Sequence, residues 1–168
     1  SASILVPCLI QDGLSVWDTL AIAEYLNELT PKAGMLPADV AARAGCRSIS
    51  GELHSGFTAL RSSLPMNLKA RYPGFKVWAG AQADIDRITT IWRECLNEYG
   101  GPYLFGAQPT LADAMYAPVT TRFATYDVRL DRAAQDYCET ILNLPDMLEW
   151  AEAAQAENVA LEELEAEF

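Results

Sequence analysis

Residues 109–113 read Pro109-Thr110-Leu111-Ala112-Asp113, and they mark the start of the most informative helix in the chain. Thr110 and Asp113 have the spacing of a capping box, in which the threonine hydroxyl accepts from the aspartate N–H and the carboxylate accepts from the threonine N–H. The sequence therefore predicts a helix that begins after Thr110 and bends at Pro118.

Helical spacing continues on both sides of that stretch. A long apolar stripe alternates in steps of three and four before Pro65, and it consists of Ala42, Cys46, Ile49, Leu53, Phe57, Leu60 and Leu64. We interpret this stripe as one helix. A second helix is predicted to end at Gly100, and two shorter ones should span about 131–142 and 145–156.

The beginning of the chain follows another pattern. Two short apolar runs, 4–10 and 14–17, flank Asp12-Gly13, a dipeptide typical of a hairpin turn. Pro7 has no N–H, so it must lie at the edge or the end of its strand. We therefore predict a β-hairpin in this region.

A helix and a linker follow the hairpin. Residues 20–29 have apolar residues at helical spacing, with Asp18 or Thr19 as the N-cap. The next stretch contains two prolines and a glycine and reads as a linker. The predicted division of the chain is a first part over 1–30, a linker over 31–39 and a helical domain over 40–168.

The overall composition argues against several classes of protein. With 168 residues, of which 51% are hydrophobic, the chain is long enough to bury a core. Its formal net charge of -11 disfavours nucleic acid as a partner, because nucleic-acid-binding proteins cluster Lys and Arg. No stretch approaches the roughly twenty apolar residues of a membrane span, so we expect a cytoplasmic protein. The four cysteines form no CxxC pair and have one histidine available, which argues against a metal site.

The order of these features resembles the cytosolic glutathione transferases of the bacterial type. The likeness rests on Val6-Pro7, on the run Ala21-Ile22-Ala23-Glu24-Tyr25-Leu26 and on the stretch 109–113. It covers essentially the whole chain and implies a mostly α fold. The all-helical C-terminal domain of that family would be preceded by a β-hairpin and a helix, the C-terminal part of a thioredoxin-like α/β domain.

The resemblance also implies a glutathione site at Val6, Pro7, Asp18 and Thr19. A cis Val6-Pro7 bond would expose the N–H and C=O of Val6, with which the cysteinyl part of glutathione pairs like an added strand. Asp18-Thr19 resembles the family's acidic residue followed by serine, where a helix N-terminus holds the γ-glutamyl carboxylate. Thr19 keeps the hydroxyl, whereas Asp18 is one methylene shorter than the commoner Glu.

No catalytic residue is expected within the chain itself. In this family the Tyr, Ser or Cys that stabilises the glutathione thiolate lies near the start of the first domain, before the strand and helix that should precede Ile4. We therefore expect the chain to lack the first part of that domain and to be inactive alone, while the intact parent protein is an enzyme.

A basic stripe is one candidate for a substrate-binding surface. Arg43, Arg47, His54 and Arg61 follow one another at spacings of four, seven and seven, so on one helix they share a side. Part of this stripe would face the cleft between the domains and attract an anionic ligand. The alternative is that these residues face solvent or form ion pairs in a dimer interface.

Three further residues are candidates for the substrate pocket. Phe57 and Tyr116 would supply apolar surface, although aromatic residues at helical spacing also belong to cores. Arg122 would hold a substrate carboxylate, as the resemblance to the zeta-like members of the family implies, or it is an ordinary surface arginine.

The function implied by the resemblance is that of a glutathione transferase. The intact protein would conjugate the thiol of glutathione, its co-substrate, to an electrophilic small molecule, with no metal. Two alternatives stay open: a zeta-like glutathione-dependent maleylacetoacetate isomerase, and a noncatalytic binding module with the transferase fold. The family also implies a homodimer, with neither nucleic acid nor a membrane as a partner.

Overall fold

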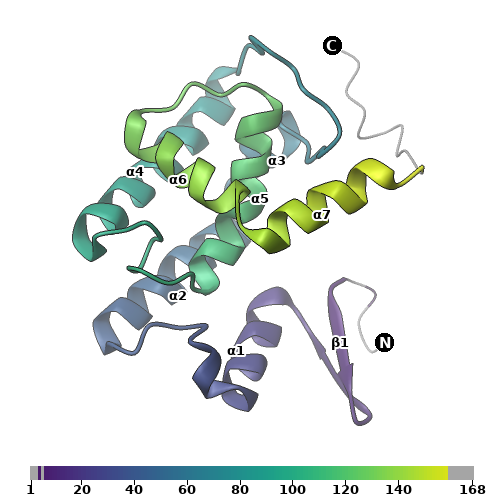
Figure 1. The fold of residues 1–168 in the computed structure, drawn as a ribbon, viewed down its shortest axis with the longest axis vertical. Coiled ribbons are helices and arrows are strands. Elements are labelled where there is room, and N and C mark those ends of the chain that lie inside the picture. The colour runs from purple at the N-terminus through teal and green to yellow at the C-terminus, as the bar shows by residue number, and fades with distance from the viewer. Residues whose placement is uncertain (1–3, 5, 159–168) are drawn as a thin grey trace.

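The computed structural model describes residue 4 and residues 6–158. Within them the chain forms a hairpin, a first helix and then a helical bundle (Figure 1). The strands are β1 (Cys8–Gln11) and β2 (Leu14–Trp17); the helices are α1 (Thr19–Leu29), the short 3-10 helix η1 (Pro31–Ala33), α2 (Val40–Ser55), α3 (Thr58–Ser63), α4 (Ala79–Tyr99), α5 (Leu111–Thr125), α6 (Arg132–Leu142) and α7 (Pro145–Ala156). The predicted mostly α fold with a leading hairpin is confirmed.

The hairpin turns at the predicted dipeptide. β1 and β2 pair antiparallel, and both turn residues, Asp12 and Gly13, have positive φ angles, 49° and 84°. This is the backbone that a two-residue hairpin turn favours. β1 begins later than the predicted run 4–10, because Pro7, directly before it, has no N–H to donate to a neighbouring strand. The Val6-Pro7 bond is cis, as the resemblance implied.

α5 is the central helix of the bundle (Figure 1). It packs against both α2 and α6, and it is buried on nearly all sides, as a helix at the centre of a core must be. The predicted capping box is present at its start, where the Asp113 carboxylate accepts from the Thr110 N–H at 2.8 Å. The helix continues through Pro118 to Thr125.

The stripe that we predicted as one helix belongs to two, so that prediction was wrong. α2 ends at Ser55, and α3 starts at Thr58 after Phe57 has adopted a left-handed conformation with φ 55°. At Gly56 an added Cβ would lie 2.7 Å from the carbonyl oxygen of Glu52, so a glycine is required there. Although the helix breaks, the stripe remains largely buried, because α2 packs on α5 and α3 packs on α4.

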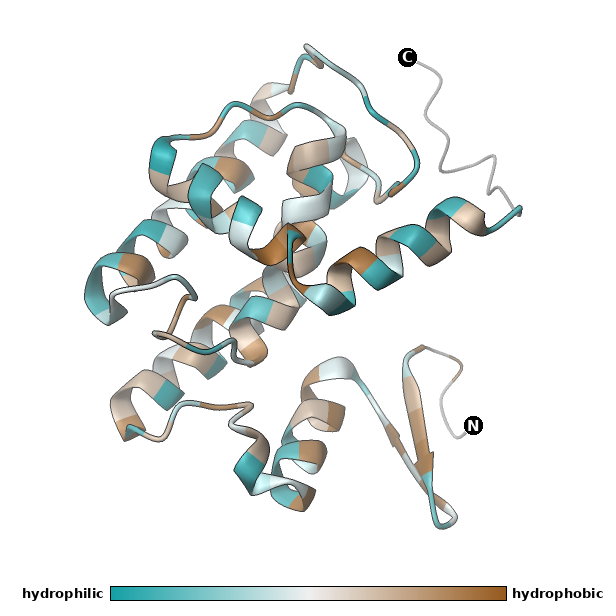
Figure 2. Cartoon of the chain, viewed as in Figure 1, coloured by the Kyte–Doolittle hydropathy of each residue, from teal (hydrophilic) through white to brown (hydrophobic). Residues whose placement is uncertain are grey.

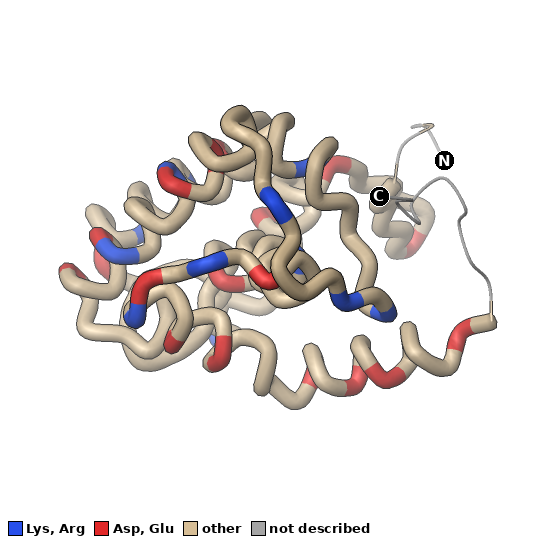
Figure 3. Tube along the Cα trace, turned by 90° about the horizontal axis from the view of Figure 1, so that it is seen from above, with Lys and Arg blue, Asp and Glu red and all other residues tan. Residues whose placement is uncertain are grey.

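The remaining helices begin and end close to the predicted positions. Asp131 caps α6 by accepting from the Ala134 N–H at 2.9 Å, Pro145 opens α7, and Gly100 ends α4 with φ 82°. α7 packs against α6 and extends away from the bundle (Figure 1). Hydrophobic and hydrophilic residues mix along it (Figure 2), and its charged residues are all acidic (Figure 3).

Residue 4 and residues 6–158 contain neither a membrane-spanning helix nor a metal-binding cluster. Among these residues, no helix has both the length and the apolar character that crossing a membrane requires. The same residues contain no group of three or more His, Cys, Asp or Glu side chains that could hold a metal ion.

Candidate functional site

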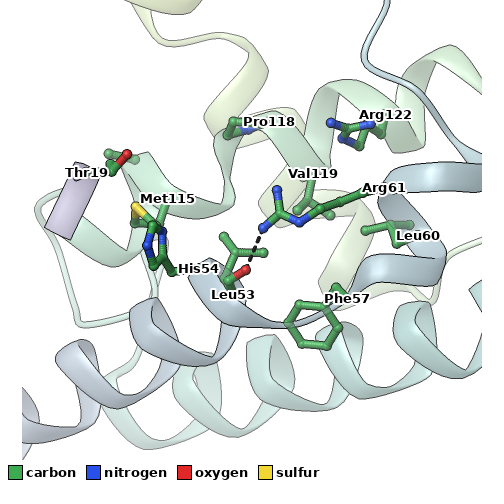
Figure 4. A pocket seen from close by; sticks show the side chains of 11 residues that line it. Thr19, Leu53, His54, Phe57, Leu60, Arg61, Met115, Pro118, Val119 and Arg122 are labelled. Atoms are coloured by element: carbon green, nitrogen blue, oxygen red, sulfur yellow. Dashed lines mark hydrogen bonds between the residues drawn. The ribbon is translucent and has the colours of Figure 1, made fainter. Parts of the chain in front are cut away.

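A pocket of about 380 Å³ lies where α1, α2, α3 and α5 meet (Figure 4). It is lined by Thr19, Leu53, His54, Phe57, Leu60, Arg61, Ala114, Met115, Pro118, Val119 and Arg122. Four of the five side chains that the sequence suggested for a substrate pocket are therefore brought together. The fold also places Thr19, a candidate glutathione ligand from another part of the sequence, at the same pocket.

Two arginines give the pocket a positive wall. Arg61 comes from α3 and donates to the carbonyl oxygens of Leu53, at 2.5 Å, and Gly56, at 3.3 Å. Arg122 comes from α5, is half-buried and donates to the carbonyl oxygen of Leu64. Burial, and then the nearby charge of Arg61, lower the pKa of Arg122 from its usual value. Among the described residues, neither arginine forms an ion pair with Asp or Glu.

Much of the remaining lining of the pocket is apolar. Phe57 and Leu60 belong to the α2–α3 break and to α3, while Met115 and Val119 come from α5 (Figure 4). Sequence analysis did not assign Met115 or Val119 to the site. Their spacing of four on one helix shows that they share a face, but spacing alone cannot distinguish a face that lines a pocket from one that fills a core.

Asp18 and His54 join the hairpin end of the molecule to the bundle. Asp18 is the N-cap of α1, and its Oδ1 accepts from the N–H groups of Leu20, at 2.9 Å, and Ala21, at 3.2 Å. Its Oδ2 lies 2.8 Å from Nε2 of His54, in the last turn of α2. The hydrogen bond from Ala21, followed by that from His54, lowers the pKa of the Asp18 carboxyl despite some opposing desolvation.

The basic stripe is divided among different partners. Arg47 forms a bidentate ion pair with Glu24 of α1, at 2.6 and 2.8 Å, and Arg43 donates to the carbonyl oxygens of Pro37 and Ala38. Arg43 and Arg47 do not line the pocket, whereas His54 and Arg61 do. The stripe therefore splits into a part that fastens α2 to preceding segments and a part that reaches the pocket.

Tyr116, proposed as a pocket residue, lies instead in the core. Its side chain is fully buried, its ring packs edge-on against Trp92 with centroids 5.8 Å apart, and its hydroxyl donates to the carbonyl oxygen of Ile49 at 3.3 Å. The physical reason is its position on α5: Tyr116 follows Met115 by one residue, and adjacent residues on a helix face different directions.

The other two proposed glutathione ligands lie at the edge of the hairpin. Val6 and Pro7 are exposed, and neither is among the residues that line the pocket. This exposure leaves the backbone of Val6 accessible, as pairing with an extended peptide would require.

None of the three buried cysteines has the properties of a reactive nucleophile. Burial raises the pKa of the thiol of Cys46, that of Cys95 to about 11 and that of Cys138 to about 12. Because the thiolate is the nucleophilic form, these side chains are inert structural groups at neutral pH. Cys8 is half-buried in β1.

The helical part of the chain matches a known protein family. The model of the glutathione S-transferase C-terminal domain matches residues 51–157, from the second half of α2 to just beyond α7. The chain belongs to this family. The match covers the helices that form two walls of the pocket, α3 and α5.

Curated relatives of the family are similar to much of the chain. A probable maleylacetoacetate isomerase of Caenorhabditis elegans is 31% identical over 115 residues, which are 68% of this chain and 53% of that protein. The maleylacetoacetate isomerase of Rattus norvegicus is 31% identical over 125 residues, 74% of this chain and 56% of that protein. The chain thus spans about half the length of the curated relatives that it matches.

Solved structures share the fold. A glutathione transferase homologue from Burkholderia, determined with bound glutathione, superposes with a TM-score of 0.67 at 23% identity, over 91% of this chain and 74% of that chain. A bacterial maleyl pyruvate isomerase of the zeta class gives a TM-score of 0.68 at 23% identity, over 92% of this chain and 76% of that chain. The arrangement of the elements in Figure 1 is therefore that of glutathione transferases.

Proposed function

We propose that the full-length protein carrying this chain uses glutathione to isomerise a small maleyl-type acid from the cis to the trans form. The observation that carries this proposal is the pair of arginines, Arg61 and Arg122, which face one pocket without a carboxylate partner among the described residues. In a chain of net charge -11, such a site selects an anionic substrate. The maleylacetoacetate isomerases that the chain resembles support the same choice.

The pocket suits both ends of such a substrate. A guanidinium binds a carboxylate through two parallel hydrogen bonds, and two guanidinium groups from different helices can hold two carboxylates or one carboxylate and a ketone oxygen. The apolar side chains of Phe57, Met115 and Val119 contact the carbon chain between them. We therefore assign the substrate pocket to Arg61, Arg122 and Phe57, with His54 at its boundary with α1.

Glutathione is proposed to lie beside that pocket, at the N-terminus of α1. The hydroxyl of Thr19 and the first N–H groups of the helix would bind the γ-glutamyl carboxylate, and Asp18 would bind the γ-glutamyl ammonium. The exposed backbone of Val6, held by Pro7, would pair with the cysteinyl unit. Because Thr19 also lines the pocket, this placement brings the γ-glutamyl end of glutathione to the edge of the substrate pocket.

The chemistry requires no net consumption of glutathione. The thiolate adds to one carbon of the cis double bond, a C–S bond forms, and the π electrons move to the conjugated carbonyl oxygen as an enolate. The former double bond is now single and rotates, after which the enolate re-forms the double bond in the trans configuration and expels the thiolate. The arginines favour this path by holding the negative charge of the substrate and of the enolate.

A second candidate is conjugation of glutathione to an uncharged electrophile. The apolar wall of the pocket favours it, since Leu53, Phe57 and Val119 could pack against an aromatic substrate. In that reaction the C–S bond is retained and a leaving group departs. Both candidates share the domain division 1–30, 31–39 and 40–168 and the homodimer expected for the family.

The test compares the two chemistries in the full-length protein. We expect maleylacetoacetate to be isomerised with the glutathione concentration unchanged, and 1-chloro-2,4-dinitrobenzene to be conjugated far more slowly. Arg122→Ala should lower kcat/KM for the maleyl acid at least about 100-fold, because it removes a charge-assisted carboxylate contact. Arg132→Ala, on the exposed side of α6, is the matched control and should leave the rate unchanged.

Faster conjugation than isomerisation would favour the second candidate. Glutathione binding without turnover of either substrate would instead indicate a noncatalytic module.

A further inference from the structure

The carboxylate of Asp18 is held at both oxygens, by two different parts of the molecule. Oδ1 caps α1 through the N–H groups of Leu20 and Ala21, and Oδ2 meets Nε2 of His54 at 2.8 Å. A carboxylate held at one oxygen still rotates about its own axis, whereas contacts at both oxygens fix its plane. Because an ionised carboxylate only accepts hydrogen bonds, Nε2 of His54 is the donor in this contact.

His54 also belongs to the wall of the pocket. Thr19 lines the same pocket (Figure 4). The backbone directly before His54 is fixed as well, because Arg61 donates to the carbonyl oxygen of Leu53 at 2.5 Å. The imidazole is thus positioned by α2 and α3, and it contacts the N-cap residue of α1.

We propose that His54 is a positioning residue for glutathione, which orients the Asp18 carboxylate toward the γ-glutamyl ammonium while Thr19 receives the γ-glutamyl carboxylate. This inference rests on the proposed function, in which that end of glutathione binds at the start of α1. A residue of the helical bundle thereby adjusts the affinity for glutathione, although the residues that bind glutathione directly all precede the bundle in the sequence. Orienting Asp18 before the ligand arrives removes an ordering cost from binding.

An ion pair nearby supplies a matched control for this role. Arg47 and Glu24 join the same two helices, α2 and α1, by a bidentate contact at 2.6 and 2.8 Å. Arg47 contacts neither Asp18 nor the pocket. Arg47 therefore represents a residue that links α1 to α2 without contacting the proposed glutathione site. His54 links α2 to the start of α1 and also contacts Asp18.

The experiment is a calorimetric titration of the full-length protein with glutathione. We expect His54→Ala to weaken binding roughly three- to tenfold, by the cost of ordering one side chain. His54→Gln should restore most of the affinity, because its amide can donate to the same oxygen. Arg47→Ala should bind like the wild type.

A second ligand isolates the orienting role. A glutathione analogue without the γ-glutamyl amino group cannot bind Asp18. His54→Ala should therefore change the affinity for this analogue less than twofold, which is within the scatter expected for a mutation that removes no contact to the ligand.

Several results would overturn the inference while leaving the proposed function intact. These are unchanged or tighter glutathione binding in His54→Ala, equal weakening by Arg47→Ala, or equal weakening for glutathione and the deaminated analogue. Absence of glutathione binding by the wild type would overturn the inference and the proposed function together.

Discussion

Asp113 and Asp18 both stand at the start of a helix, and their surroundings differ completely. Asp113, in the first turn of α5, is 1% exposed and accepts from the N–H groups of Leu104, at 3.0 Å, and Thr110, at 2.8 Å. It also accepts from the hydroxyls of Thr110, at 3.0 Å, and Tyr137, at 3.1 Å. Asp18, before α1, has a side chain that is 44% exposed and accepts from two N–H groups and His54.

The comparison separates a structural carboxylate from one that can serve a ligand. Every hydrogen bond to Asp113 comes from the chain, and no surface is left through which a ligand could reach it. Asp18 is fixed in orientation, yet nearly half of its side chain faces solvent. The same residue type at the start of a helix therefore stabilises the bundle in one place and offers a binding group in the other.

The largest expected effect is on the buried side of the comparison. Asp113→Ala would leave the N–H groups of Leu104 and Thr110 and the hydroxyl of Tyr137 without their acceptor, and unsatisfied buried groups are costly. We expect the free energy of unfolding to fall by about 3–5 kcal/mol in urea denaturation. Asp131→Ala, which removes the exposed N-cap of α6, is the control and should cost about 1 kcal/mol. Equal losses of unfolding free energy in the two variants would show that burial does not make Asp113 more important for stability than Asp131.

The next effect concerns the exposed carboxylate and its dependence on pH. The pKa of Asp18 is lowered in the folded protein, so its ionised form contributes stability above about pH 3.9, the usual value of an unfolded aspartate. This contribution is lost as the pH falls through the lower folded pKa. We therefore expect Asp18→Ala to be destabilised by about 1 kcal/mol at pH 7, and by less at pH 3. A difference from wild type that widens on acidification would contradict the assigned direction.

The smallest effect is expected at the ion pair that joins α1 to α2. Arg47 and Glu24 are 48% and 37% exposed, and exposed pairs contribute little because water and salt screen them. Arg47→Ala should lower the free energy of unfolding by about 0.2–1 kcal/mol, with a smaller loss in 1 M salt. A double-mutant cycle with Glu24→Ala measures the pair itself. A coupling above about 2 kcal/mol would place this junction with the core rather than with the surface.

Local features of the fold could be predicted from the sequence because neighbouring residues determine them. The Thr110–Asp113 box, the Asp12-Gly13 turn and the opening of α7 at Pro145 each depend on residue types a few positions apart. The break between α2 and α3 was missed, although Gly56 was its sequence signal. The regular spacing of the apolar stripe continued across Gly56 and concealed it.

The candidate site was harder to predict because its contacts are distant in sequence. Asp18 and His54 are 36 positions apart, and the two arginines of the pocket come from α3 and α5. Periodicity placed His54 and Arg61 in one stripe but could not show that Arg47 in the same stripe pairs with Glu24. It also could not assign Tyr116 to the core and Met115 to the pocket, because that depends on which neighbours pack against each face of α5.

The break at Gly56 links the proposed choice of substrate, at Arg61, to the proposed binding of glutathione, at His54. It breaks the helix so that Arg61, from α3, caps the end of α2 at the carbonyl oxygens of Leu53 and Gly56, close to His54. Under the proposed function, a variant that accepts a new substrate by replacing Arg61 must also supply a new cap for that helix end. Under the proposed roles of Arg61 and His54, a substitution at position 61 that changes the substrate is expected to change the affinity for glutathione as well, and a compensating second mutation should accompany it.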